Sequence, residues 1–200
     1  TVEHEALCAL AARDTGIRTP HLEAIAAVDP GGHAMVLAYE RIEGRSLDRA
    51  TAEELTDAVL AAVWRQVADL RSHRIAHRDL RLANVFLDAE GTPWIIDFGF
   101  SELAARDEQL ATDVAELLAS TASIVGPQRA VAAAMAEVGA EAVGSAIPRL
   151  QPNALSGATR AATKQTPHSL DALREEAQRQ SGAPAVELER LERGSLKTVQ

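Results

Sequence analysis

The stretch His77-Arg78-Asp79-Leu80-Arg81-Leu82-Ala83-Asn84-Val85, followed by Asp97-Phe98-Gly99, decides how this sequence is interpreted. Asp79 is followed by an asparagine five positions on and by a second aspartate eighteen positions on. Asn84 and Asp97 carry the oxygen ligands that Mg²⁺ prefers in proteins. Neither stretch decides much alone, but their order and separation are hard to produce by chance.

A short hairpin is predicted between the two stretches. Residues 85–87 and 93–96 are apolar and flank a turn at residues 88–91, which contains aspartate and glycine. Such a hairpin fixes the distance between Asn84 and Asp97. Both side chains can then reach the same metal ion.

The pattern H-R-D-L-x-x-x-N followed by D-F-G resembles the catalytic loop of protein kinases. The resemblance to the protein-kinase-like phosphotransferases covers about residues 3–147 and is specific over 77–99. It implies an α+β fold with a mostly helical C-lobe and part of the N-lobe, namely the αC helix and the fourth and fifth strands, with the N-terminus truncated. The implied domains are a partial N-lobe and hinge (1–44), a C-lobe (45–147), and a connector with C-terminal helices (148–200).

The resemblance also implies ATP and Mg²⁺ as cofactors, with a role for each residue of the loop. Asp79 would accept the proton of the acceptor hydroxyl, and Arg81 would meet the γ-phosphate or the developing charge. Asn84 and Asp97 would hold Mg²⁺. His77 would keep the shape of the loop. The alternative is a set of unrelated turn residues, which leaves their joint spacing unexplained.

The nucleotide side of the site is expected in the first 47 residues. Residues 3–13 predict a helix, ended by Asp14-Thr15-Gly16, that corresponds to the kinase αC helix. The glutamate of that helix pairs with a lysine of the third N-lobe strand in kinases. Glu5 is the candidate and Glu3 the alternative. Either could instead be an acidic residue favoured by the helix dipole.

A hinge follows a predicted hairpin. Residues 22–28 and 34–39 are short apolar stretches around a Pro-Gly-Gly turn. The next residues are similar to the kinase hinge. Glu40 and Ile42 would supply the backbone groups that hold the adenine edge, and Tyr39 would stand beside the pocket.

The segment after Gly99 departs from typical protein kinases. Residues 100–112 are few, and no Ala-Pro-Glu follows them. Asp113 already resembles the start of the αF helix, where an aspartate stabilises the catalytic-loop backbone. A full activation segment forms the platform for a peptide substrate. The short segment favours a small-molecule, sugar or lipid acceptor, or an atypical protein substrate.

Further helices are predicted from periodicity. A capping box at Thr51–Glu54 opens a core helix that continues to about Ser72, with Trp64 as a packing residue rather than a ligand platform. The remaining expectations are helices over 114–125, 128–138, 169–180 and 184–193, and a connector over 148–168.

Bulk properties exclude several function classes. The 200 residues carry a net charge of −9 without basic runs, which argues against nucleic acid as a partner. The single Cys8 cannot form an internal disulfide, which favours a reducing, intracellular setting. No apolar run is expected to approach the roughly 18 residues of a spanning helix, and we expect no signal peptide, so a soluble chain is predicted.

Two departures leave catalysis open. The only lysines are Lys164 and Lys197, and neither a Gly-rich phosphate loop nor the N-lobe lysine is present. Because the first residue is Thr1 rather than Met, we expect this chain to be a piece of something longer. Besides an active phosphotransferase, the sequence therefore admits a regulatory pseudokinase that binds nucleotide or nothing. A helical scaffold with coincidental motifs is the remaining alternative.

A narrower resemblance rests on the Ala-rich composition, residues 77–87 and the tail around Leu188-Glu-Arg-Leu-Glu-Arg. Together they are similar to the cytosolic kinase-like domain of actinobacterial lysylphosphatidylglycerol-synthase/flippase-like proteins. That resemblance implies a fused membrane domain after residue 200. The present domain would then lie at the cytoplasmic face of the membrane.

Overall fold

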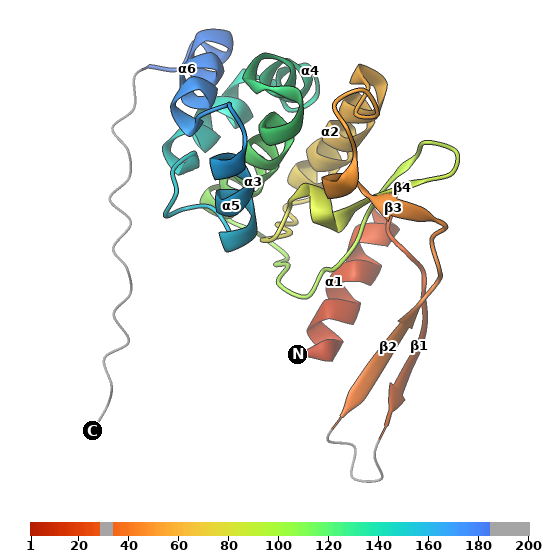
Figure 1. Cartoon of the computed structure of the whole chain (residues 1–200). Helices are drawn as coiled ribbons and strands as arrows, with labels where there is room; N and C mark the ends of the chain where they lie inside the picture. Colours follow the sequence, from red (N-terminus) through yellow and green to blue (C-terminus); the bar gives the residue numbers. More distant parts are fainter. Residues whose placement is uncertain (29–33, 185–200) are drawn as a thin grey trace, which may run out of the picture.

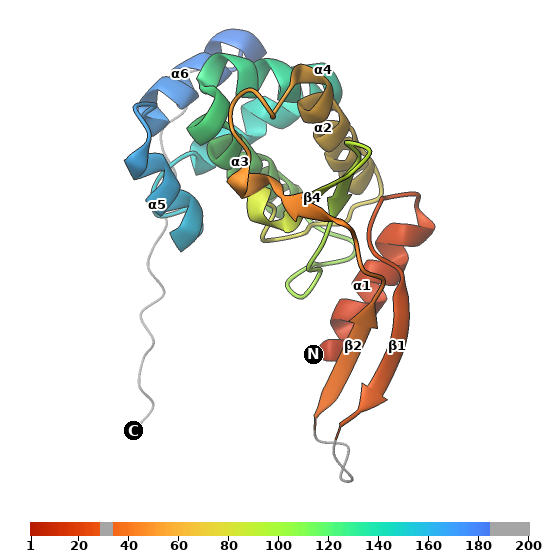
Figure 2. The same ribbon diagram turned by 45° about the vertical axis from the view of Figure 1, so that its right-hand side comes forward.

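The computed structural model describes residues 1–28 and 34–184. A helix, α1 (Val2–Asp14), and a hairpin of strands β1 (Leu22–Ala27) and β2 (Met35–Tyr39) lie side by side at one end of the molecule (Figures 1 and 2). The helices from α2 (Asp57–Ser72) to α6 (Leu170–Ser181) gather at the other end. A small three-stranded sheet lies between them, in the order β3 (Gly44–Ser46), β4 (Val85–Asp88) and β5 (Pro93–Ile95). This mixture of helices and strands confirms the predicted α+β fold.

Helix α1 (Val2–Asp14) matches the predicted helix 3–13. The Thr1 hydroxyl caps it by accepting the His4 N–H, and the chain leaves it through Gly16, whose φ of +92° suits glycine. Leu7 and Leu10 lie on the exposed side of the helix. The buried face is made of small residues: Ala6, Cys8, Ala9 and Ala12.

Strands β1 (Leu22–Ala27) and β2 (Met35–Tyr39) form the predicted antiparallel hairpin. Ile25 pairs with Leu37 in its middle. The Glu40 N–H donates to the His21 carbonyl at 2.8 Å, so the pairing reaches the hinge. The expected Pro-Gly-Gly turn lies outside the described residues.

The second hairpin, β4 (Val85–Asp88) and β5 (Pro93–Ile95), is confirmed, and it gains a strand that we did not expect. Strand β3 (Gly44–Ser46) pairs antiparallel with β4. A Cβ at Gly44 would stand 2.2 Å from the Leu87 carbonyl oxygen, so only glycine permits this approach. The segment after the hinge is thereby held against the hairpin that follows the catalytic loop.

Helix α2 (Asp57–Ser72) ends where predicted but begins later. Thr51 and Glu54 do exchange the two hydrogen bonds of a capping box, at 2.8 and 3.4 Å. The prediction that this box opens the helix is nevertheless wrong. Thr56 has extended backbone angles and is the true N-cap, with its hydroxyl accepting from the Val59 N–H. The box instead closes a separate turn after the short 3₁₀ helix η1 (Leu47–Arg49).

Helices α3 (Asp107–Val125) and α4 (Pro127–Ala146) are both longer than predicted. Gly126, with φ of +84°, separates them. Asp113 therefore lies inside α3 rather than at its start. Helix α4 has a kink at Gly139, whose backbone angles are φ 80° and ψ 172°.

The helical stretch 127–149 is long and apolar enough to cross a membrane by length and composition, so the expectation of no such run was wrong. Within the fold its central helix, α4, packs against α2, α3 and α6. Because α4 packs against three other helices, it serves as an internal helix of the helical end.

Part of the expected connector 148–168 is helical. Helix α5 (Gly157–Gln165) follows the 3₁₀ helix η3 (Ile147–Arg149), and α6 (Leu170–Ser181) matches the predicted helix 169–180. The buried Glu116 of α3 fixes the start of α5, because it accepts the Ser156 N–H at 3.0 Å and the Thr159 hydroxyl. Such a tertiary contact leaves no periodic signal in the sequence. The predicted helix 184–193 lies almost entirely outside the described residues.

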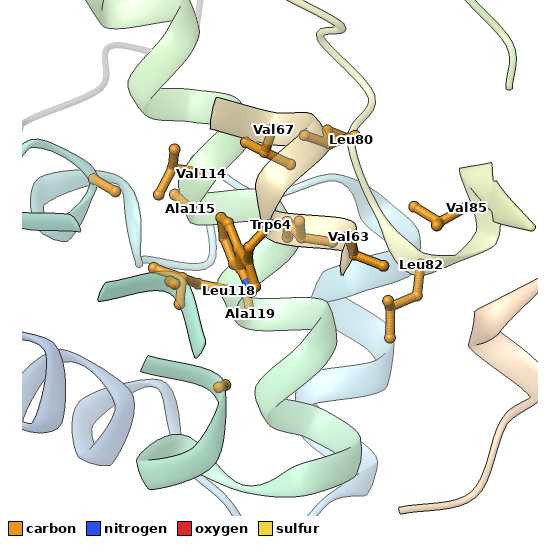
Figure 3. Close-up of a cluster of buried hydrophobic side chains, with 14 of the residues drawn as sticks. Val63, Trp64, Val67, Leu80, Leu82, Val85, Val114, Ala115, Leu118 and Ala119 are labelled. Carbon is orange, nitrogen blue, oxygen red and sulfur yellow. The ribbon is translucent and has the colours of Figure 1, made fainter. Parts of the chain in front are cut away.

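Trp64 of α2 lies at the centre of the helical core. Its side chain is fully buried, and Figure 3 shows it against α3 residues such as Leu118. The same cluster includes Leu82 and Val85, which lie on either side of Asn84 in the sequence. The packing role predicted for Trp64 is confirmed, and this core holds the end of the catalytic loop in place.

Candidate active site

The catalytic loop, residues 77–84, holds the carboxylate of Asp79 at both oxygens. The Asn84 Nδ2 donates to Asp79 Oδ2 and to the Asp79 carbonyl, each at 2.8 Å. The Arg81 Nε donates to Asp79 Oδ1 at 3.0 Å, and this bond raises the pKa of Arg81. The short 3₁₀ helix η2 (Leu82–Asn84) turns Asn84 back toward Asp79. The structure thus brings together three residues that the sequence singled out.

Asp113 of α3 anchors the start of this loop from within the helical core, as predicted. Its two carboxylate oxygens accept the backbone N–H groups of His77 at 2.6 Å and Arg78 at 2.7 Å. Burial raises the pKa of Asp113 to about 7, and the two N–H donors oppose that rise. Arg78 has φ of +64°, a sparsely populated region for a residue with a side chain. The two hydrogen bonds stabilise this strained turn.

The His77 ring supports the loop from the other side. Its buried Nε2 lies 2.9 Å from the Ile96 carbonyl oxygen, a contact that requires the proton on Nε2. Nδ1 is buried and has no hydrogen-bond partner among residues 1–28 and 34–184. Burial of the ring lowers the pKa of His77. The ring also packs at 5.0 Å from the ring of Phe98. These contacts fit the predicted scaffold role for a neutral histidine.

Replacing Asp113 with asparagine should loosen the catalytic loop. An amide group keeps one acceptor but places an NH₂ against the other backbone N–H. Losing a hydrogen bond to a charged acceptor should lower the free energy of unfolding by about 1.5–3 kcal/mol. Urea denaturation of the complete protein measures this change. Asp107→Asn, on the exposed first turn of the same helix, is the control; an equal loss in both variants would contradict the anchoring role.

The Asp97-Phe98-Gly99 turn faces α1. Asp97 has φ of +66°, and the Gly99 N–H donates weakly to its Oδ1 at 3.4 Å. A Cβ at Gly99 would stand 3.2 Å from Asp97 Oδ1 and 3.6 Å from Glu5 Oε2. Glycine therefore leaves space where the carboxylates of Glu5 and Asp97 approach each other.

A cavity of about 340 Å³ opens between α1, the hinge and this turn. Its walls include the residues predicted for the αC helix and the hinge and one predicted metal ligand: Glu5, Tyr39, Glu40, Ile42 and Asp97. Arg81 and the second predicted metal ligand, Asn84, are not among the residues that line it. The Tyr39 hydroxyl donates to Glu5 Oε1 at 3.4 Å. Burial and the nearby carboxylates raise the pKa of Tyr39 to about 12, so it stays a donor. The alternative residue, Glu3, is exposed and lies outside this cavity.

Helix α1 is bound to the segment that follows the turn. The His4 Nε2 lies 2.7 Å from the Ser101 carbonyl oxygen, and the buried Cys8 thiol donates to the same oxygen at 3.7 Å. The Ser101 hydroxyl donates to the His77 carbonyl at 3.3 Å. This chain of contacts fixes Glu5 relative to the catalytic loop.

The oxygen atoms at the site suit Mg²⁺ bound together with a nucleotide. Within residues 1–28 and 34–184, no three His, Cys, Asp or Glu side chains cluster as a self-sufficient metal site. Mg²⁺ in nucleotide sites commonly takes one or two protein carboxylates and completes its shell with phosphates and water. Asp97 offers a carboxylate at the cavity wall. Asn84 uses its amide nitrogen on Asp79, which leaves its side-chain oxygen for a cation.

A second cavity, of about 460 Å³, borders the other end of the loop. Arg81 and Leu82 form one wall, and α3 and α5 form the others. No sequence pattern predicted this cavity, because α5 falls within the segment interpreted as a connector. The alanines of α5 carry too weak a periodic signal to mark a binding wall.

Comparisons with known proteins agree with this architecture. The family model described as the protein kinase domain matches residues 22–127, which is more than half of the chain. The chain therefore belongs to the protein kinase domain family, and its fold is a partial kinase-like α+β fold.

Three kinases illustrate the similarity. Serine/threonine-protein kinase dst3 of Dictyostelium discoideum is 42% identical over 60 residues, covering 30% of this chain and 11% of that protein. A probable leucine-rich repeat receptor-like serine/threonine-protein kinase of Arabidopsis thaliana is 29% identical over 130 residues, covering 58% of this chain and 12% of that protein. Cysteine-rich receptor-like protein kinase 28 of the same plant is 30% identical over 112 residues, covering 50% of this chain and 16% of that protein. The chain thus spans well under a fifth of each of these relatives.

Proposed function

We propose that the complete protein is an ATP- and Mg²⁺-dependent phosphotransferase that transfers the γ-phosphate to a hydroxyl group. The observation that carries this proposal is the 340 Å³ cavity, which gathers the hinge residues Glu40 and Ile42 with Glu5 and Asp97. Its size is that of a small-ligand pocket. The family match supports the same class of reaction.

In this proposal the residues of the loop position the reactants. Asp97 and Asn84 would hold Mg²⁺, which would neutralise phosphate charge on bound ATP, the source of the phosphoryl group. Asp79 orients the acceptor hydroxyl and takes its proton, while Arg81 keeps the Asp79 carboxylate in place at 3.0 Å. Asp113 positions the loop without touching the reactants.

The acceptor in this proposal is a small molecule rather than an extended peptide. The chain after Gly99 turns at once toward the helical end, where Glu102 forms a two-way backbone bridge with Ala76 at 2.8 and 3.0 Å. Helix α3 begins at Asp107, only a few residues later. Little chain remains there to form a peptide platform.

Replacing Asp97 with asparagine should weaken the binding of magnesium nucleotide. An amide retains one neutral oxygen but loses the charge that attracts the cation. We expect the affinity for ATP with Mg²⁺ to fall about tenfold or more, equivalent to about 1.4 kcal/mol. Isothermal titration of the complete protein measures it. Titration in EDTA is the matched condition, in which wild type and variant should agree; equal affinity in Mg²⁺ would refute a metal role for Asp97.

A nucleotide-binding regulatory domain without catalysis is the second candidate. The observation that favours it is the Glu5 carboxylate, whose hydrogen-bond partner among the described residues is the Tyr39 hydroxyl. A lysine at that place is a charge-assisted clamp on the phosphates. Tight ATP binding by the complete protein, with no transfer to any acceptor, would select this candidate.

The proposed chemistry belongs in the cytoplasm, where a protein can draw on ATP and Mg²⁺. The fused membrane domain and the narrower resemblance to lysylphosphatidylglycerol-synthase/flippase-like proteins stay predictions. Sequencing the native gene on both sides of the chain tests them directly.

A further inference from the structure

The second cavity lies against the catalytic loop rather than the hinge. Its volume of about 460 Å³ falls in the range of small-ligand pockets. Arg81 lines it, and the Arg81 Nε is bonded to Asp79 Oδ1 at 3.0 Å. Asp97 lines the first, nucleotide cavity. Arg81, the hydrogen-bond partner of Asp79, lines the second cavity.

Three of the hydroxyl groups that line this cavity donate their hydrogens within the protein. The Ser120 hydroxyl donates to the Leu117 carbonyl at 3.1 Å, and the Ser123 hydroxyl donates to the Ser120 carbonyl at 2.7 Å. The Thr159 hydroxyl donates to the Glu116 carboxylate. What these three groups can still offer a ligand is oxygen lone pairs. The Thr166 hydroxyl and the Gln165 amide also line the cavity, so a matching ligand can both donate and accept hydrogen bonds.

The charged and apolar walls narrow the choice of ligand further. Among the described residues, one cationic side chain, Arg81, and one carboxylate, Asp48, line the cavity, and no aromatic side chain lines it. A quaternary ammonium group is recognised by aromatic faces, and an anionic lipid headgroup by clustered Lys and Arg. Leu82, Ile124 and Ala162 instead supply flat aliphatic surface. Hydroxyl donors combined with C–H faces describe a carbohydrate-like molecule.

We propose that the second cavity binds the acceptor of the phosphotransferase, and that this acceptor is a small neutral sugar or polyol. The inference rests on the proposed function and specifies its substrate class. One ligand hydroxyl would reach Asp79 beside Arg81. Its oxygen forms a bond to the γ-phosphorus as the bond between that phosphorus and the β–γ bridging oxygen breaks. Its proton passes to Asp79, and ADP is released.

Binding can be tested without turnover. The complete protein is titrated calorimetrically with glucose, ribitol, glycerol and myo-inositol, and separately with ATP and Mg²⁺. Ala162→Phe fills the cavity from α5, whereas Ala161→Phe places the same ring on the exposed side of that helix. We expect at least one sugar or polyol to bind the wild type. Ala162→Phe should weaken that binding at least tenfold, and Ala161→Phe should change it less than twofold.

A second variant tests the same cavity in case Ala162→Phe does not fold. Ser123→Val replaces a cavity oxygen of α3 with two methyl groups, a smaller increase in volume than the ring of Ala162→Phe, and melting temperatures identify any variant that has not folded. It should also weaken sugar binding while the affinity for ATP is retained. Absence of sugar or polyol binding, or binding that ignores both Ala162→Phe and Ser123→Val, would overturn the assignment of the cavity. Phosphorylation of a serine peptide by the wild type, at a rate that Ala162→Phe leaves unchanged, would also overturn the assignment.

The two proposals fail in different ways. If the wild type binds ATP with Mg²⁺ but no sugar or polyol, the acceptor assignment is refuted and the phosphotransferase proposal stands. If the wild type does not bind ATP, the phosphotransferase proposal is refuted and the acceptor role falls with it, even where a sugar occupies the cavity.

Discussion

Replacement of Asp79 with asparagine should reduce phosphoryl transfer by about 10²–10⁴-fold, because asparagine cannot take up the proton of the acceptor hydroxyl. Asparagine is nearly the same shape and retains an oxygen that can accept from Arg81 or Asn84, so the loop should keep its fold. The nucleotide cavity does not include Asp79 among its walls, so the affinity for ATP with Mg²⁺ should change little. The loss should appear in kcat.

The measurement is ADP formation by the complete protein at saturating ATP, together with titration of nucleotide binding. Asp69→Asn, on the exposed surface of α2, is the matched control and should behave as wild type. Unchanged turnover in Asp79→Asn would remove Asp79 from the reaction. A loss of nucleotide affinity as large as the loss of rate would instead point to a disturbed loop.

Replacement of Trp64 with alanine should lower the free energy of unfolding by about 3–5 kcal/mol, the range found for large aromatic residues in packed cores. Trp64 is fully buried between α2 and α3, and its removal would leave a cavity that the helices cannot close (Figure 3). The neighbouring Leu82 and Val85 would lose support, so the loop at Asn84 should loosen as well.

Urea denaturation compares three variants of the two tryptophans. Trp94→Ala is the control, since Trp94 is half-buried on the small sheet and bonds to Asp88 at 2.8 Å. Trp94→Ala should lower the free energy of unfolding less than Trp64→Ala does. Trp64→Phe should also lower it less than Trp64→Ala, because the ring of phenylalanine fills part of the space. Among the described residues the buried indole Nε1 has no hydrogen-bond partner, so its loss breaks no hydrogen bond. A larger loss in Trp94→Ala than in Trp64→Ala would contradict the packing described here.

The sequence predicted best where residue type and spacing act locally. The hairpin between Asn84 and Asp97 follows from two short apolar runs and the turn between them, and the structure has it at the predicted residues. The roles of Glu5, Tyr39, Glu40 and Ile42 stay predictions, although these residues share one cavity. The division at residues 44 and 147 also stays a prediction.

The sequence predicted less where distant contacts decide. Thr51 and Glu54 form a capping box, yet Thr56 begins the helix, because a local motif can close a turn as well as cap a helix. The start of α5 depends on Glu116, about forty residues away, and no periodicity encodes such a contact. The second cavity therefore had no sequence signal.

The close approach of Gly44 to the Leu87 carbonyl has a mechanical consequence. Because β3 is paired with β4, the chain beyond Gly44 must move as one body with the catalytic loop. Rotation of the hairpin β1–β2 away from that body would have to pivot at residues 41–43, which link Glu40, still bonded to His21, to Gly44. A bulky residue at Gly44 would separate β3 from β4 and uncouple the hinge from the catalytic loop.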